Sequence, residues 1–261
     1  MKIVLALAKG STMRMRLALV FVFLCNAVNA FGQQAALPDG AVLHVASAPG
    51  AINQLVFSPD GNWLAATSKN SILLFNANTG KELRRWNASK GDVGAIVFTP
   101  DGKTLASGSD VGVVLWDPTN AKERRRIATD SPVKALAFNR NGESLTACLA
   151  NASVHQWNSA NGTLITSQAL DAKPLVPTLA PTAEHIVWGT QQSKERFEVR
   201  WLDVRTGKRF APLDPRAANT EKIGGGGIAP SGMAFSPDGK LLAISELDQN
   251  RANTIRVWEA I

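Results

Sequence analysis

A five-residue phrase returns along this chain at a nearly constant interval. It first reads Phe57-Ser58-Pro59-Asp60-Gly61 and then Phe98-Thr99-Pro100-Asp101-Gly102, and later copies stand at Phe138-Asn139-Arg140-Asn141-Gly142 and Phe235-Ser236-Pro237-Asp238-Gly239. The first three copies lie 41 and then 40 residues apart. A repeat of about 40 residues with a strand-turn-strand centre is typical of a β-propeller, whose blades are four-stranded antiparallel sheets. The repeat therefore predicts an all-β fold.

The first repeat shows how one blade is expected to form. Apolar runs at 52–57, 63–67 and 72–75 predict three strands, and the run at 82–86 predicts a fourth. Asp60-Gly61 supplies the tight turn after the first strand, since glycine adopts positive φ without steric cost. The four strands are expected to run in order from the central shaft outward.

A large ring recurs on the third strand of each predicted blade. Packing between neighbouring blades needs bulk at one place per blade, so we expect these rings to be structural. They are Phe75, Trp116, Trp157, Trp201 and Trp258.

The end of the chain predicts how the propeller closes. The last unit stops at its third strand, 254–258, whereas Ala41 to Ala46 is a strand-like run that precedes the first blade. We expect this run to complete the last blade, which gives about five four-stranded blades closed by the N-terminal strand. The alternative is that the five blades form an open arc, which a second copy of the chain completes in a homodimer.

The phrase Phe-Ser-Pro-Asp-Gly and the run Val114-Leu115-Trp116-Asp117 resemble the WD40 repeat family. The resemblance extends from about Ala41 to Ile261 and is that of a divergent, bacterial-type exported propeller. Only Trp116-Asp117 keeps the dipeptide that names the family, and the Gly-His pair of the family is absent. The resemblance implies a binding scaffold, with a partial form of the family's buried polar network at Ser107, Asp110 and Trp116.

Residues 1–30 have the composition of a secretory signal peptide. They carry four basic residues and no acidic ones, followed by the apolar run 17–25 and a small-residue stretch that ends at Ala30. The apolar run is shorter than the roughly 20 residues of a membrane span. We expect cleavage before Phe31, a linker at 31–40, a propeller at 41–261 and a periplasmic or secreted location. An uncleaved anchor, a start at Met13 and a cytoplasmic scaffold are the alternatives.

Charge and cysteine content limit the partners further. The chain has 28 basic and 21 acidic residues, and 24 basic and 21 acidic residues remain without the leader, a net charge of +3. Such a weak excess of positive charge, in a chain without tyrosine, argues against nucleic acid as a partner. Only Cys148 remains after cleavage, so the mature chain forms no internal disulfide.

The sequence shows no catalytic or metal-binding constellation. His44, His155 and His185 fall in strand-like runs of different blades, and none adjoins a nucleophilic turn. There is no Cys-x-x-Cys motif and no His-x-x-x-His pair. We therefore expect no enzyme activity, no cofactor and no metal.

Basic pairs recur on the outermost strands. They are Arg84, Arg85, Arg125 and Arg126. Charges on an edge strand protect it from pairing with other chains. A basic rim patch for an anionic partner is the alternative.

The sequence favours an exported, non-enzymatic scaffold that binds a protein through one loop face. That face would be made by the turns between second and third strands together with the links between blades. Its candidate binding residues are Lys69, Asn70, Asp110, Asn151, Lys194, Arg196, Gln249 and Arg251. An enzyme or small-ligand receptor that uses polar residues at the central channel is the alternative function.

Overall fold

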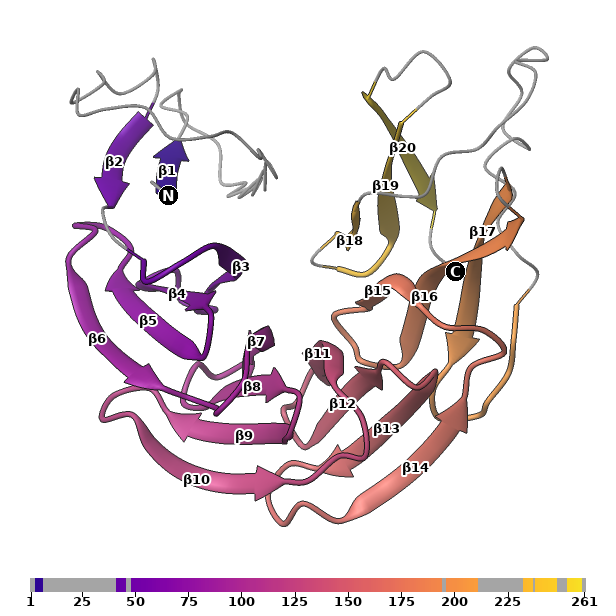
Figure 1. The fold of residues 1–261 in the computed structure, drawn as a ribbon, viewed down its shortest axis with the longest axis horizontal. Helices are drawn as coiled ribbons and strands as arrows, with labels where there is room; N and C mark the ends of the chain where they lie inside the picture. The colour runs from indigo at the N-terminus through magenta and orange to yellow at the C-terminus, as the bar shows by residue number, and fades with distance from the viewer. Residues whose placement is uncertain are drawn as a thin grey trace. The chain divides into compact units, whose positions relative to one another are not determined.

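The computed structural model describes residues 3–6, 41–45, 48–193, 196–210, 232–236, 238–247 and 253–259 of the 261 (Figure 1). These residues form strands β1 to β20, and no helix occurs among them. The described part accordingly contains no helix with the length and apolar character needed to cross a bilayer. The chain divides into two compact units, Met1–Ala48 and Pro49–Ile261.

The larger unit consists of five antiparallel sheets, each built from strands consecutive in sequence. The first three sheets have four strands and the last two have three within the described residues. The first sheet is β3 (Ile52–Phe57), β4 (Trp63–Ser68), β5 (Ser71–Asn76) and β6 (Glu82–Asn87). The second is β7 (Val93–Phe98), β8 (Leu105–Ser109), β9 (Gly112–Asp117) and β10 (Lys122–Ile127). The third is β11 (Val133–Phe138), β12 (Ser144–Leu149), β13 (Ser153–Asn158) and β14 (Leu164–Ala169). The fourth is β15 (Leu175–Leu179), β16 (His185–Ser193) and β17 (Arg196–Asp203), and the fifth is β18 (Gly232–Phe235), β19 (Leu241–Leu247) and β20 (Asn253–Glu259).

The five sheets follow one another as the blades of a propeller do. The first strands of successive sheets, β3, β7, β11, β15 and β18, contact each other in that order (Figure 1). The predicted all-β fold with five blades is confirmed. A fourth strand is described in the first three blades. In the fourth blade an isolated bridge joins Leu202 to Arg209, and residues 211–231 lie outside the described part.

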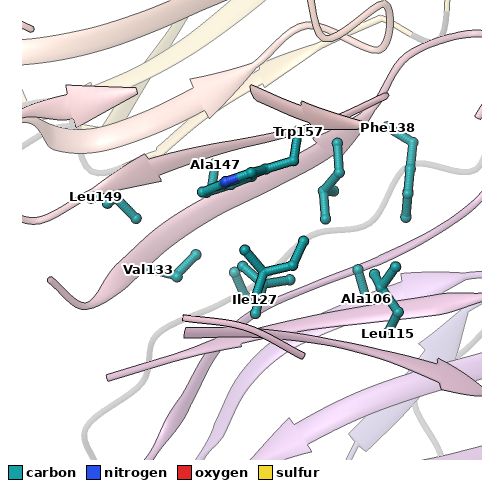
Figure 2. Close-up of a cluster of buried hydrophobic side chains, with 11 residues drawn as sticks. Ala106, Leu115, Ile127, Val133, Phe138, Ala147, Leu149 and Trp157 are labelled. Carbon is teal, nitrogen blue, oxygen red and sulfur yellow. The ribbon is translucent and has the colours of Figure 1, made fainter. Parts of the chain in front are cut away.

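Apolar side chains fill the space between neighbouring blades. Figure 2 shows Leu115 and Ile127 of the second sheet facing Val133, Leu149 and Trp157 of the third. Burial of this apolar surface is the main stabilising contribution in a propeller without disulfides. Four of the five ring positions expected from the sequence, Trp116, Trp157, Trp201 and Trp258, take part in these apolar clusters. Phe75, Trp116, Trp157 and Trp201 are buried, and Trp258 is partly buried.

The repeated phrase forms a turn closed by side chains. In the first blade the Ser58 hydroxyl donates to Asp60 Oδ1 at 2.5 Å and accepts from the Trp63 amide at 2.9 Å. Gly61 has φ +72°, as the turn requires. The fifth blade repeats these bonds with Ser236 and Asp238. The phrase therefore recurs because it joins the first two strands of a blade rigidly.

The N-terminal unit departs from the expected closure. Strand β2 (Ala41–Val45) is paired antiparallel with β1 (Ile3–Ala6), and the last sheet contains β18, β19 and β20. This pairing belongs to the uncleaved chain, because β1 lies within the predicted signal peptide 1–30. The remainder of the predicted signal peptide and the linker at 31–40 lie outside the described residues.

Candidate functional site

Each blade presents two kinds of turn at opposite ends of its sheet. In a four-stranded antiparallel meander, the turn after the first strand and the turn after the third emerge at one end, which we call the phrase end. The turn after the second strand and the link to the next blade emerge at the other end, which we call the link end. The sequence pointed to the link end, whereas two cavities lie at the phrase end.

The larger cavity lies between the second and third blades and measures about 380 Å³. Its walls include Lys103, Thr104, Arg124 and Arg125 from the second blade and Asn141 from the third. A second cavity of about 250 Å³ lies in the corresponding place between the first and second blades. The two share Asp101, Lys103 and Arg124, so they adjoin along the same end of the propeller.

Side-chain volume accounts for the difference between these two cavities. Thr104 in the larger cavity stands where Trp63 stands in the smaller one, since each residue follows its phrase turn by the same number of positions. The indole of Trp63 packs against Phe98, with ring centroids 6.4 Å apart. A threonine leaves this space open in the second blade.

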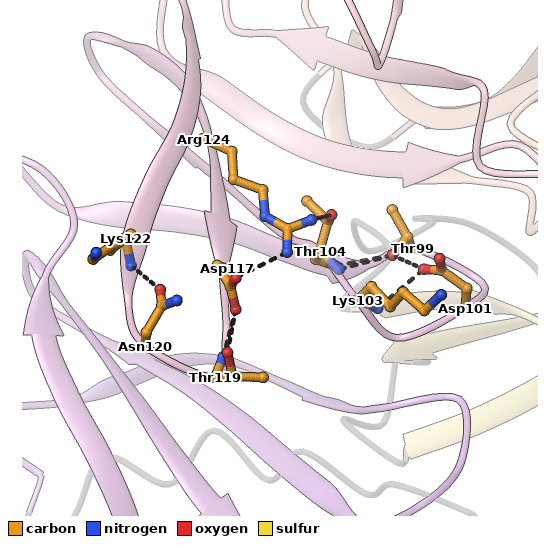
Figure 3. Close-up of polar contacts among 9 residues, drawn as sticks. All are labelled: Thr99, Asp101, Lys103, Thr104, Asp117, Thr119, Asn120, Lys122 and Arg124. Carbon is orange, nitrogen blue, oxygen red and sulfur yellow. Dashed lines mark hydrogen bonds and ion pairs between the residues drawn. The ribbon is translucent and has the colours of Figure 1, made fainter.

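A β-bulge aims Arg124 at both cavities. The pairing of β10 with β9 shifts between Glu123 and Arg125, so Arg124 has no partner in the register. Such a bulge redirects a side chain from the regular alternation of a strand. Arg124 donates from Nη1 to Thr104 Oγ1 and from Nη2 to Asp117 Oδ2, both at 2.9 Å (Figure 3).

Asp117 anchors this guanidinium from the turn after β9. Its Oδ1 accepts from the Thr119 hydroxyl at 2.6 Å and from the Thr119 amide at 2.9 Å (Figure 3). The Thr119 hydroxyl bond, followed by the contact with Arg124 and then by the Thr119 amide bond, lowers the pKa of Asp117 from 3.8 to about 2. Asp101 is held in the neighbouring turn by the Thr99 hydroxyl, which lowers its pKa as well. Both carboxylates are therefore ionised at neutral pH.

The two cavities differ in charge. The larger is lined by three cationic side chains, Lys103, Arg124 and Arg125, and by one carboxylate, Asp101. The smaller is lined by two of these cations and by three carboxylates, of Asp60, Asp101 and Asp117. Cationic side chains therefore outnumber carboxylates in the lining of the larger cavity, and carboxylates outnumber cations in that of the smaller.

The candidate residues that the sequence placed on the link end are described in the first three blades. Asp110 accepts from the Ser89 hydroxyl at 3.5 Å, and the Asn151 amide donates to Asp130 at 3.2 Å. Each bond joins the turn after the second strand of a blade to the link that leads into the same blade. Lys69 has φ +50°, and its aliphatic chain lies over Gly50.

The remaining link-end candidates are not all described. Asn70 accepts from the Ala88 amide through its main-chain oxygen at 2.8 Å, which again joins a second turn to a link. Arg196 begins β17. Lys194, Gln249 and Arg251 lie outside the described residues.

The basic pairs of the outer strands make contacts within the propeller. Arg84 Nη2 donates to the Thr119 carbonyl oxygen of the next blade at 2.9 Å, and Arg125 Nη1 donates to the Asn161 carbonyl oxygen at 2.8 Å. The second arginine of each pair forms an ion pair within its own strand, Arg85 with Glu82 and Arg126 with Glu123. The first arginine of each pair is thus an inter-blade contact, which a strand-by-strand interpretation of the sequence does not reveal.

Part of the polar network expected from the resemblance is present. Trp116 Nε1 donates to Ser107 Oγ at 2.8 Å, and both residues are buried. Asp110 takes part in the link contact described above. Cys148 is fully buried, and burial raises the pKa of its thiol to about 12.

His155 and His185 lie beside the aromatic rings of Trp157 and Phe210, at centroid distances of 5.5 and 5.9 Å. His44 lies in β2, opposite Val4. Within the described ranges, no three His, Cys, Asp or Glu side chains come together as a metal site.

Comparison with known families identifies two of the repeats. The family model described as WD domain, G-beta repeat (WD40) matches residues 40–76 and 80–117. The second match covers β6 followed by β7, β8 and β9, and the first places β2 in the position of β6. No curated protein matches the chain.

Proposed function

Since the chain belongs to the WD40 repeat family, we propose that it is an exported, non-enzymatic scaffold that binds another protein through one end of its propeller. Propellers of the WD40 family are in general scaffolds for protein–protein interaction. The proposal adds export, the absence of catalysis and the use of a turn-bearing end as the binding surface.

One observation carries this proposal: the matched repeats form blades whose turns are fixed by side-chain hydrogen bonds and enclose cavities open to a partner. Thr99 and Asp101 close the turn at the wall of the larger cavity, and Asp117 and Thr119 fix the turn beside it. A surface that is ordered before binding loses little conformational entropy when a partner docks. The leader at 1–30 supports export.

Polar residues on the innermost strands give less support to a receptor or enzyme at the channel. Asn53 Nδ2 donates to the Val93 carbonyl oxygen at 3.1 Å, and Gln54 Oε1 accepts from the Ile96 amide at 2.7 Å. Both side chains therefore join the first blade to the second.

The test is crosslinking in the organism that makes the protein, followed by mass spectrometry of the captured species. Two variants are compared with the wild type, one at the link end (Lys69→Ala with Asn151→Ala) and one at the phrase end (Lys103→Asn with Arg124→Leu). The proposal expects one protein partner in stoichiometric amount, lost in one variant and retained in the other. Retention of the partner by both variants contradicts the use of these ends.

Catalysis is tested separately on the purified protein. Incubation with the extract of the compartment in which it is found should leave metabolite and peptide profiles unchanged. Reproducible turnover of a compound by the wild type contradicts the non-enzymatic part of the proposal.

A further inference from the structure

We propose that the cavity between the second and third blades is a carboxylate-binding site for an acidic segment of a protein partner. Lys103, Arg124 and Arg125 converge on it from two elements of the second blade, the phrase turn and β10. This inference rests on the proposed scaffold function and names the chemistry of its partner.

The repeat itself shows that the fold does not require cations at the positions of Lys103 and Arg124. The outer strands β6, β10 and β14 each have a bulge at the same place in the blade. The bulged residue is Arg124 on β10, Leu83 on β6 and Ile165 on β14. Likewise, the position of Lys103 is occupied by Asn62 in the first blade and by Glu143 in the third. Of these three blades, only the second carries cations at both positions.

The cations keep donors for a ligand. A guanidinium has five N–H donors. Among the described residues, Arg124 directs one bond to Thr104 and one to Asp117, and Arg125 directs one to Asn161. These bonds hold the guanidinium groups in place. The remaining N–H groups and the Lys103 ammonium can then bind a carboxylate with charge-assisted hydrogen bonds.

The shape of the cavity favours a peptide side chain over a nucleic acid. Leu115 and Phe138 lie against it but are each only 4% exposed, so no ring is available for stacking a base. A volume of about 380 Å³ accommodates a small group and not an extended polyanion. The carboxylate of a Glu or Asp side chain fits this combination of size and charge.

The adjoining cavity also limits which residues can lie next to the acidic residue in the bound segment. Asp60, Asp101 and Asp117 make it acidic, and it shares a wall with the larger cavity. An acidic residue over this second cavity would meet like charge, which weakens binding. The preferred segment therefore carries its acidic residue at one end and an uncharged or basic residue at the other.

The experiment measures binding of a capped, fluorescent hexapeptide, two glutamates followed by four glutamines, to the full-length protein by anisotropy. The test variant is Lys103→Asn with Arg124→Leu, which installs the residues that the first blade has at these positions. The matched control is Lys240→Asn with Arg205→Gln, which removes the same charge from exposed positions of the last two blades. We expect the test variant to lose about tenfold or more in affinity and the control to stay within about twofold.

Each other outcome overturns the inference. Absence of binding to the wild type, equal binding by the test variant, or an equal loss in the control removes the site. Equal binding of a hexaglutamine peptide shows that charge is not recognised. Displacement by inorganic phosphate at the concentration of the peptide shows a small-anion site and not a peptide site.

The capture experiment separates this inference from the scaffold proposal. If the test variant still captures the partner, the scaffold function stands and the carboxylate site does not. If the peptide binds but the wild type captures no protein, the site stands and the scaffold function does not.

Discussion

Arg84 and Thr119 join the outer strand of the first blade to a turn of the second. The guanidinium Nη2 donates to the main-chain oxygen of Thr119 at 2.9 Å, and Arg125 repeats the contact one blade later with Asn161. The blades depend on such contacts, because no backbone ladder connects one blade to the next among the strands that the structure describes. These arginines therefore belong to the scaffold as well as to its surface.

Replacing Arg84 by Ala should destabilise the propeller. We expect the free energy of unfolding to fall by about 1 kcal/mol, because an inter-blade hydrogen bond is lost at an exposed site. Urea denaturation measures the change. Arg126→Ala is the matched control, since it removes an exposed ion pair within one strand and should cost about 0.5 kcal/mol or less. A greater loss in the control than in Arg84→Ala would refute the inter-blade role.

Trp116→Phe should be more destabilising than Trp201→Phe. The first change leaves the buried Ser107 hydroxyl without its donor, which costs about 1–3 kcal/mol in addition to the lost ring volume. Trp201 is equally buried, but its Nε1 has no hydrogen-bond partner among the described residues. Thermal or urea unfolding of the two variants measures the difference. Equal destabilisation would show that the Ser107 bond contributes nothing.

Acid should remove the contribution of Asp117. Its pKa is lowered to about 2 in the folded chain, so its stabilising effect is present above the usual carboxyl pKa of 3.8 and is lost as the pH falls through 2. Asp117→Asn isolates the charge, since Asn76 and Asn158 hold the same turn in the first and third blades. Urea unfolding from pH 2 to 6 should show the wild type more stable than the variant above pH 4, with the gap closing below. A gap that is constant with pH would contradict the assignment.

Cys148 should react only when the protein unfolds. Burial raises the pKa of its thiol to about 12, so the thiolate is scarce and inaccessible at pH 7. Labelling of a Cys25→Ser chain with a thiol reagent, with and without denaturant, measures this. We expect modification of the native protein at the rate of unfolding. Modification at the rate of a free thiol would show that β12 is open to solvent.

The sequence predicted the blades well because the signals that build them are local. The phrase fixes its turn through Ser58 and Asp60, two residues apart, and the strands of the first blade begin within a residue of their expected positions. The ring at Trp116 follows from one bulky residue per blade. These features depend on residues that are close in the sequence, so the repeat pattern is enough to predict them.

The features that the sequence did not reveal depend on neighbours in space. Arg84 reads as an exposed edge charge until Thr119 of the next blade is placed beside it. The larger cavity needs Thr104 in place of a tryptophan and a bulge at Arg124, and its walls come from two blades. The apolar pattern of Ala41 to Ala46 predicts a strand but does not identify its partner, which in the uncleaved chain is β1.

The most direct test of the account is native mass spectrometry of the protein isolated from the envelope and extracellular fractions of its own organism. One spectrum reports the N-terminus and the assembly together. We expect a chain that begins at Phe31 and is found outside the cytoplasm in complex with a different protein. A full-length chain confined to the cytoplasm would contradict export, and a processed chain found only alone or with copies of itself would contradict the scaffold function.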